Sequence, residues 1–89
     1  MKTTIADIET AIAHAETEIA KYAAVKRSLA ADRDAGKLTA AYAAKEMLRA
    51  SIPAAAAQRE VRAMSEREVD GTPSDALLDR AEKIDVWGW

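Results

Sequence analysis

The residue types that most often perform catalysis are scarce in this chain of 89 residues. It has a single histidine, His14, and no cysteine. A lone histidine without a neighbouring base or orienting carboxylate is typical of a solvated helix residue rather than a general acid or base. The lack of cysteine excludes disulfides, zinc–thiolate sites and a thiol nucleophile. Nucleophile-elbow, phosphate-loop and zinc-protease motifs are also missing, so we expect no enzyme and no catalytic residue.

Three acidic residues towards the C-terminal end form the one grouping that could suggest a metal site. Asp75, Asp79 and Glu82 share one face at helical spacing. A hard cation needs six or more oxygen ligands that converge from several directions, and one helix face cannot supply them. The group is therefore interpreted as a solvated acidic face, and we expect no metal and no cofactor.

Basic residues are concentrated in the middle of the chain, so nucleic-acid binding has to be considered. Residues 36–69 contain six Lys/Arg and four Asp/Glu, whereas residues 1–35 contain five and six, and residues 70–89 two and five. Glutamates alternate with the basic residues, which is typical of a solvated helix face, and DNA-binding helices present a denser basic surface. A nucleic-acid-binding regulator is therefore disfavoured. The basic segment could instead receive the acidic C-terminal segment, within one molecule or between copies.

Both tryptophans, Trp87 and Trp89, fall within the last three residues of the sequence. Tryptophan is enriched at the energetic centres of protein interfaces, so these residues are predicted to bind a partner protein. The alternative is that they fold back and cover a core that is otherwise built of alanine and isoleucine.

The composition favours helices and provides little core. Of 44 apolar residues, 22 are alanine, which has the highest helix propensity but buries little area. Between residues 4 and 34, large side chains recur at alternating spacings of three and four. This heptad pattern predicts a long helix with a seam that another helix must cover, and we expect self-association through the seam residues Ile5, Ile8, Ile12, Ile19, Tyr22 and Leu29. Thr4 with Asp7 resembles a capping box, and Gly36 a helix stop.

A short polar reversal then predicts an antiparallel helical hairpin. The second arm is expected over residues 39–52 and 54–69, with Thr39 as N-cap and a kink or break at Pro53. On this arm, Ala41 and Ala44 extend the face of Leu48, and Tyr42 is expected to pack within the hairpin together with Tyr22.

Thr72-Pro73-Ser74-Asp75 predicts a C-terminal helix over residues 72–85, with Thr72 as N-cap and Pro73 at the first helical position. The apolar face of this helix is expected to contain Leu77, Leu78, Ala81 and Ile84, and residues 86–89 form an aromatic tail. The fold class is therefore all-α, in a single domain. No signal peptide or membrane span is evident, and we expect a cytoplasmic protein.

The stretch Ala35-Gly36-Lys37-Leu38-Thr39-Ala40-Ala41-Tyr42, followed by Met47-Leu48, resembles an element of small helical proteins of tailed bacteriophages and prophages. In those proteins a long helix ends in a Gly-Lys-(Leu/Ile)-Thr turn and a second helix returns, and the resemblance covers residues 5–52. It implies a protein in the host cytoplasm that binds and inhibits a host protein or defence complex, or one that assists virion assembly. It assigns no functional residue. We expect a non-catalytic, self-associating interaction module with a protein partner and a dimer favoured; the alternatives are a structural component of a virion and the nucleic-acid-binding regulator.

Overall fold

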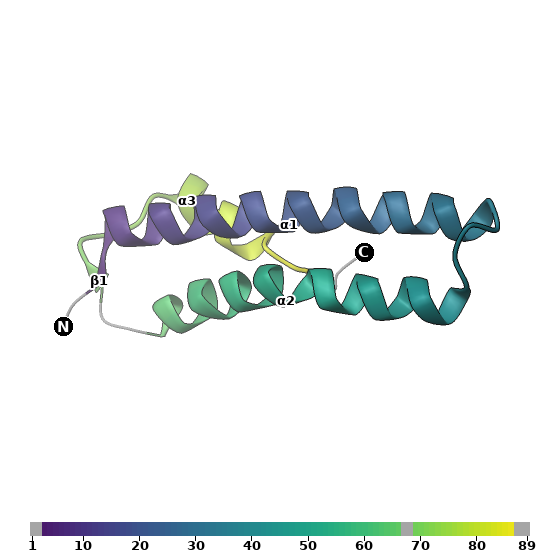
Figure 1. Cartoon of the computed structure of the whole chain (residues 1–89). Helices are drawn as coiled ribbons and strands as arrows, with labels where there is room; N and C mark the ends of the chain where they lie inside the picture. Colours follow the sequence, from purple (N-terminus) through teal and green to yellow (C-terminus); the bar gives the residue numbers. More distant parts are fainter. Residues whose placement is uncertain (1–2, 67–68, 87–89) are drawn as a thin grey trace.

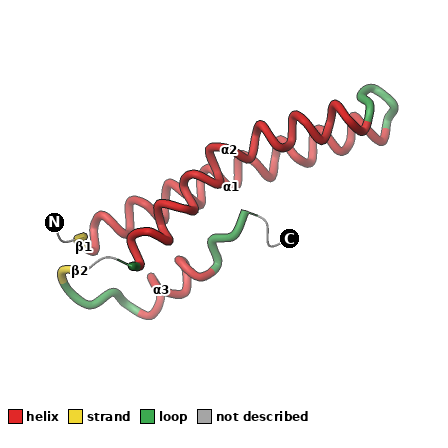
Figure 2. Tube along the Cα trace, turned by 90° about the horizontal axis from the view of Figure 1, so that it is seen from below, coloured by secondary structure: helices red, strands yellow, loops and turns green. Residues whose placement is uncertain are grey.

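The computed structural model describes residues 3–66 and 69–86 and has the shape of a rod, with extents of 52 × 23 × 16 Å. Two long helices, α1 (Ile5–Asp34) and α2 (Ala40–Ser65), lie side by side in opposite directions (Figure 1). A short helix, α3 (Asp75–Glu82), lies along one side of this pair at the end that is far from the α1–α2 turn (Figure 2). The predicted all-α hairpin is therefore confirmed. Among the described residues, no helix is long and apolar enough to pass through a membrane.

Local sequence signals fix both ends of α1. The Thr4 hydroxyl accepts a hydrogen bond from the backbone N–H of Asp7, and the Asp7 carboxylate accepts one from the backbone N–H of Thr4. This is the predicted capping box. At the other end Gly36 has φ +78°, its N–H bonds the Arg33 carbonyl, and the Lys37 N–H bonds the Asp32 carbonyl. These paired bonds form a Schellman motif, which explains why the helix stops at this glycine.

Helix α2 begins at the predicted N-cap, where the Thr39 hydroxyl accepts from the Tyr42 N–H. It then continues through Pro53 to Ser65 as one helix. Of the two alternatives predicted at Pro53, a kink or a break, the break is therefore wrong. The two halves of α2 are tilted relative to each other near the middle of the helix, as expected for an internal proline (Figure 1). Ala54 and Ala57 are buried directly after the proline, and we attribute the continuity to this packing together with the high helix propensity of residues 54–57.

The connection from α2 to α3 differs from the prediction. The helix ends at Ser65 instead of residue 69, and β2 (Val69–Asp70) forms a short parallel pair with β1 (Thr3–Thr4). No alternating pattern marks two-residue strands, so the sequence did not predict them. Gly71 has φ +107°, and a Cβ added there would lie 3.0 Å from Cδ1 of Ile5. The glycine therefore allows the chain to turn closely over the start of α1.

Helix α3 is shorter than the predicted segment 72–85. Its N-cap is Ser74, whose hydroxyl accepts from the Leu77 N–H, so the assignment of Thr72 as N-cap is wrong. Both hydroxyl residues fit the capping pattern, and the position of Leu77 in the core selects the later one. After Glu82 the chain leaves the helix but remains packed, with Ile84 and Val86 buried.

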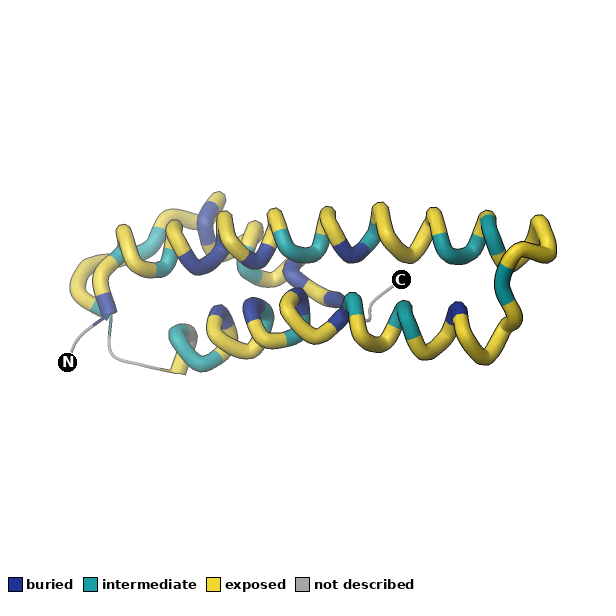
Figure 3. Tube along the Cα trace, viewed as in Figure 1, coloured by how far each residue is buried: buried dark blue, intermediate teal, exposed yellow. Residues whose placement is uncertain are grey.

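The core lies between α1, the second half of α2 and the α3 segment. One cluster joins residues from all three elements: Ala11, Ile12, Ala15, Ala57, Val61, Leu77 and Ile84. A second, smaller cluster joins Tyr22, Ala54 and Val86. The buried positions are concentrated in the half of the hairpin that α3 covers (Figure 3). In the half towards the turn only α1 and α2 pack together. Between the turn and Ser51, Ala43 is the one buried residue described on α2.

Burial should decide the effect of truncating an isoleucine. Ile12 is fully buried, so Ile12→Ala is expected to lower the free energy of unfolding by about 2–5 kcal/mol. Ile52 is 60% exposed, so the matched variant Ile52→Ala should change it by less than about 0.5 kcal/mol. Urea denaturation of both variants measures the difference, and equal losses would contradict the arrangement of α2.

Replacing the internal proline should stabilise the hairpin. Pro53→Ala provides a backbone N–H for the Arg49 carbonyl and removes the steric conflict of the ring within a continuous helix. We expect the free energy of unfolding to rise by about 1–3 kcal/mol, measured by urea denaturation followed by circular dichroism. A loss of stability would show that the tilt at Pro53 is required for packing against α1.

Candidate protein-interaction surface

The most exposed large apolar side chains lie on one face of α2. Leu48 is 65% and Ile52 60% exposed, and they are one helical turn apart. At 100° per residue they point away from the buried residues Ala43, Ala54 and Val61. Together with neighbouring alanines they form the outer stripe of α2, which we define as Ala41, Ala44, Leu48, Ile52 and Ala55.

Basic residues border the outer stripe. Lys45, Arg49 and Arg59 lie within about a quarter turn of it and are exposed. The two acidic residues inside α2, Glu46 and Glu60, lie about 120° and about 80° round the helix from the nearest stripe residue, Ile52. Glu46 forms an ion pair with Arg49 (Oε1–Nη1 3.9 Å) from that side. The outer face of α2 therefore combines a narrow apolar seam, small residues and a positive border.

The seam predicted for self-association is used inside the chain. Ile12 and Tyr22 are buried, Ile5, Ile8 and Ile19 pack against the core clusters, and Leu29 is half-buried. A second copy could reach these residues only if α2 and α3 moved away. Self-association through this seam remains a prediction, and it would compete with the monomer's own core.

The face of Leu48 is not the packing face of α2. The residues on the inner face of α2 are mostly small and follow their own heptad spacing: Ala43, Met47, Ala50, Ala54, Ala57 and Val61. Tyr42 is 51% exposed, so the expectation that it packs within the hairpin is wrong, whereas Tyr22 does so. The alternating spacing of these residues marks a second possible packing face of α2, which would have made the face of Leu48 and Ile52 one of two candidates for the outward side. The expected packing was based on large side chains, although small ones allow closer helix packing.

The predicted partner-binding residues Trp87 and Trp89 lie outside the described residues. The chain is held on α2 immediately before them. The Val86 N–H donates to Oε1 of Gln58 at 2.6 Å, and Nη2 of Arg62 donates to the Ile84 carbonyl at 3.3 Å. Val86 itself is 1% exposed. Val86, the last described residue, is therefore held next to Tyr22 and Ala54.

The remaining candidate residues for chemistry lie at the surface. His14 is exposed at a shallow hollow that is also lined by Asp7 and Glu60. Within residues 3–66 and 69–86, no group of three or more His, Asp or Glu side chains could hold a metal ion.

Two charged groups on α3 form defined ion pairs. The Arg80 guanidinium donates to both carboxylate oxygens of Glu16 on α1, and this hydrogen bonding raises the pKa of Arg80 above its ordinary value. Lys83 is paired with Asp79 at 2.8 Å, and the hydrogen bond to that carboxylate raises the pKa of Lys83. Both pairs are exposed, and we assign neither a role in chemistry. The Arg80–Glu16 pair joins α3 to α1, whereas the Lys83–Asp79 pair lies within the α3 segment.

The hydrogen bond from Val86 to Gln58 should hold the end of the α3 segment on α2. Gln58→Leu removes the acceptor, and we expect the Val86 amide to exchange about fivefold faster with solvent, because such a bond contributes about 1 kcal/mol. Hydrogen exchange followed by NMR measures this rate. The control variant Glu60→Leu replaces a polar side chain with leucine at an exposed position. It should leave the hydrogen-exchange rate of the Val86 amide unchanged.

Comparison of the chain with protein-family models, with curated proteins and with solved structures gave no match. A functional assignment therefore depends on the chemistry of the surfaces described above. Among these surfaces, the outer stripe of α2 has the large apolar side chains with the highest exposed fractions.

Proposed function

We propose that the protein is a non-catalytic protein–protein interaction module that binds a partner helix along the outer stripe of α2. The observation that supports this is the exposure of Leu48 and Ile52 on the side of α2 that faces away from the hairpin. A helix that only formed the hairpin would typically have polar residues at these positions. Apolar residues one turn apart on an exposed helix are typical of helix-in-groove and helix–helix recognition.

Charge and side-chain size together define the partner. The outer stripe has alanines at both ends. These small residues allow the axis of a second helix to approach that of α2 to about 8 Å, at the close limit of helix packing. Lys45, Arg49 and Arg59 border it, so the complementary helix has an apolar seam with Asp or Glu on its flanks. A second copy that used the same stripe would bring basic borders together, which disfavours that form of self-association.

The alternatives explain this surface less well. A nucleic acid would pair with the basic border, but its phosphates would gain nothing from Leu48 and Ile52 between the cations. A subunit of a virion also fits a helix-binding stripe, and it differs in that the partner would be a structural protein. The resemblance to phage proteins favours a bacterial host protein as the partner, in line with the proposed inhibitory role and a location in the host cytoplasm.

Site-specific photocrosslinking tests the proposal in the cells that produce the protein. A photoreactive residue replaces Ile52 in the full chain, and a second version has it at Leu78, which is 48% exposed on α3. We expect the photoreactive residue at position 52 to crosslink one partner protein, within an acidic helical segment of that partner. The residue at position 78 should not crosslink this protein. Identical products from both positions, or a product that is a second copy of this chain, would contradict the proposed partner class.

A charge substitution separates recognition from stability. Leu48→Asp places an acidic group in the stripe and should reduce crosslinking from position 52 at least about tenfold, equivalent to about 1.4 kcal/mol of binding free energy. The matched control Leu78→Asp, an exposed leucine on α3, should leave crosslinking unchanged. Circular dichroism should show the same helix content in both variants, because neither side chain is buried.

A further inference from the structure

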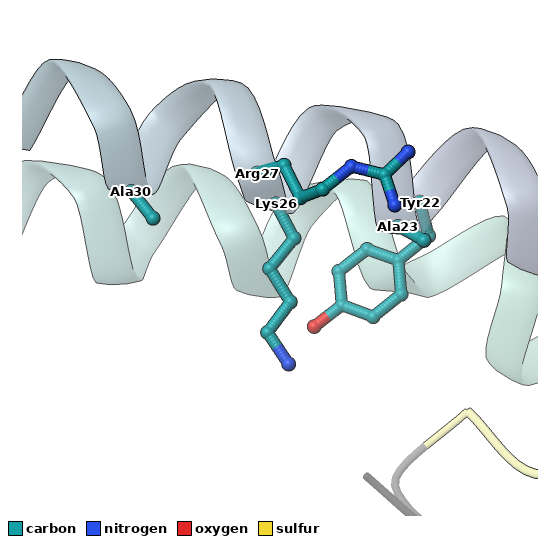
Figure 4. Close-up of a pocket in the computed structure, with 5 residues that line it drawn as sticks. All are labelled: Tyr22, Ala23, Lys26, Arg27 and Ala30. Atoms are coloured by element: carbon teal, nitrogen blue, oxygen red, sulfur yellow. The ribbon is translucent and has the colours of Figure 1, made fainter.

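A groove extends along α1 beyond the point where the described chain ends. It has a volume of about 330 Å³ and is lined by Tyr22, Ala23, Lys26, Arg27 and Ala30 (Figure 4). We call it the distal furrow. Tyr22 belongs both to the furrow and to the cluster that includes Val86, so the furrow begins where the last described residue is packed.

The distal furrow continues the path of the α3 segment along the hairpin. Ile19 on α1 lines a hollow together with Arg80, Lys83 and Ile84. At 100° per residue, Ala23 and Ala30 lie within about 40° of Ile19 on the surface of α1. The α3 segment runs along one side of the hairpin (Figure 2). The residues that line the furrow follow Ile19 along that side of α1.

The furrow has the chemistry of a site for an aromatic ring. The Lys26 side chain lies alongside the Tyr22 ring, Arg27 extends along α1 toward Tyr22 and Ala23, and Ala30 lies further along the helix (Figure 4). The Lys26 ammonium lies 6.0 Å from the centroid of the Tyr22 ring. An indole that lies alongside this pair would contact a second aromatic ring and would have a cation nearby, and both interactions favour tryptophan.

The next residues of the chain have the matching length and type. Trp87, Gly88 and Trp89 follow Val86, and they contain both tryptophans of the sequence. Three residues span up to about 10 Å, and Ala23 and Ala30, seven residues apart on α1, are separated by about 10 Å along the helix. We infer that the distal furrow is an indole-binding site whose occupant is the tryptophan segment of the same molecule. This inference is independent of the partner proposed for α2.

Tryptophan fluorescence of the full chain tests the inference directly. We expect emission at shorter wavelength than in denaturant and severalfold weaker quenching by acrylamide, with both properties independent of protein concentration. Trp87→Phe and Trp89→Phe identify which indole is protected. Emission of the folded protein at the denatured position would overturn the inference, and so would protection that is lost on dilution, because the occupant would then be a second copy.

A furrow substitution and its neighbour localise the site. Ala30→Glu places a charged side chain in the furrow and should raise acrylamide quenching severalfold, whereas Ala31→Glu adds the same charge at an exposed position and should not. Equal effects of the two variants would overturn the assignment. Nuclear Overhauser contacts between an indole ring and the methyl groups of Ala23 and Ala30 provide a measurement on the unaltered chain, and their absence would also overturn it.

Discussion

The pairing of a large-residue seam on α1 with a small-residue seam on α2 is the interaction on which the rest of the structure depends. Isoleucines and Tyr22 on one helix pack with Ala54 and Ala57 on the other, and both alanines are almost fully buried. Large side chains from one helix thus occupy the space left by small ones on its neighbour, so both helices can pack closely without voids. Because alanine suffices on the inner face, the larger apolar residues of α2 are available for its outer face.

The same constraint divides the hairpin into two halves with different properties. Near β1, α3 and the segment after it add a third layer, and Leu77, Ile84 and Val86 enlarge the core. Near the turn only the two helices pack. Between the turn and Ser51, Ala43 is the one described residue of α2 that is fully buried. Both proposed contact surfaces involve this less covered half: the distal furrow on α1, and the outer stripe, which begins at Ala41 and crosses the middle of α2.

Local signals in the sequence were sufficient for the elements whose ends depend on local chemistry. The capping box at Thr4, the glycine stop at Gly36 and the cap at Thr39 all have the predicted geometry, since each depends on residues within one turn. The break considered at Pro53 and the N-cap predicted at Thr72 are wrong, because both features depend on packing against residues far along the chain. Burial of Ala54 and Ala57 against α1 offsets the penalty of the proline, and burial of Leu77 decides where α3 begins.

The sequence by itself determined that the chain folds as an antiparallel helical hairpin with a long first helix. Composition, heptad spacing and caps are properties of single residues and near neighbours, and they point to the same fold. Only the tertiary structure decided which face of α2 is buried, that the isoleucine seam is occupied within the molecule, and where the α3 segment ends. The physical reason is that α2 has two apolar stripes, and periodicity cannot rank them. The choice between them depends on how closely each can approach α1, and the small residues approach more closely.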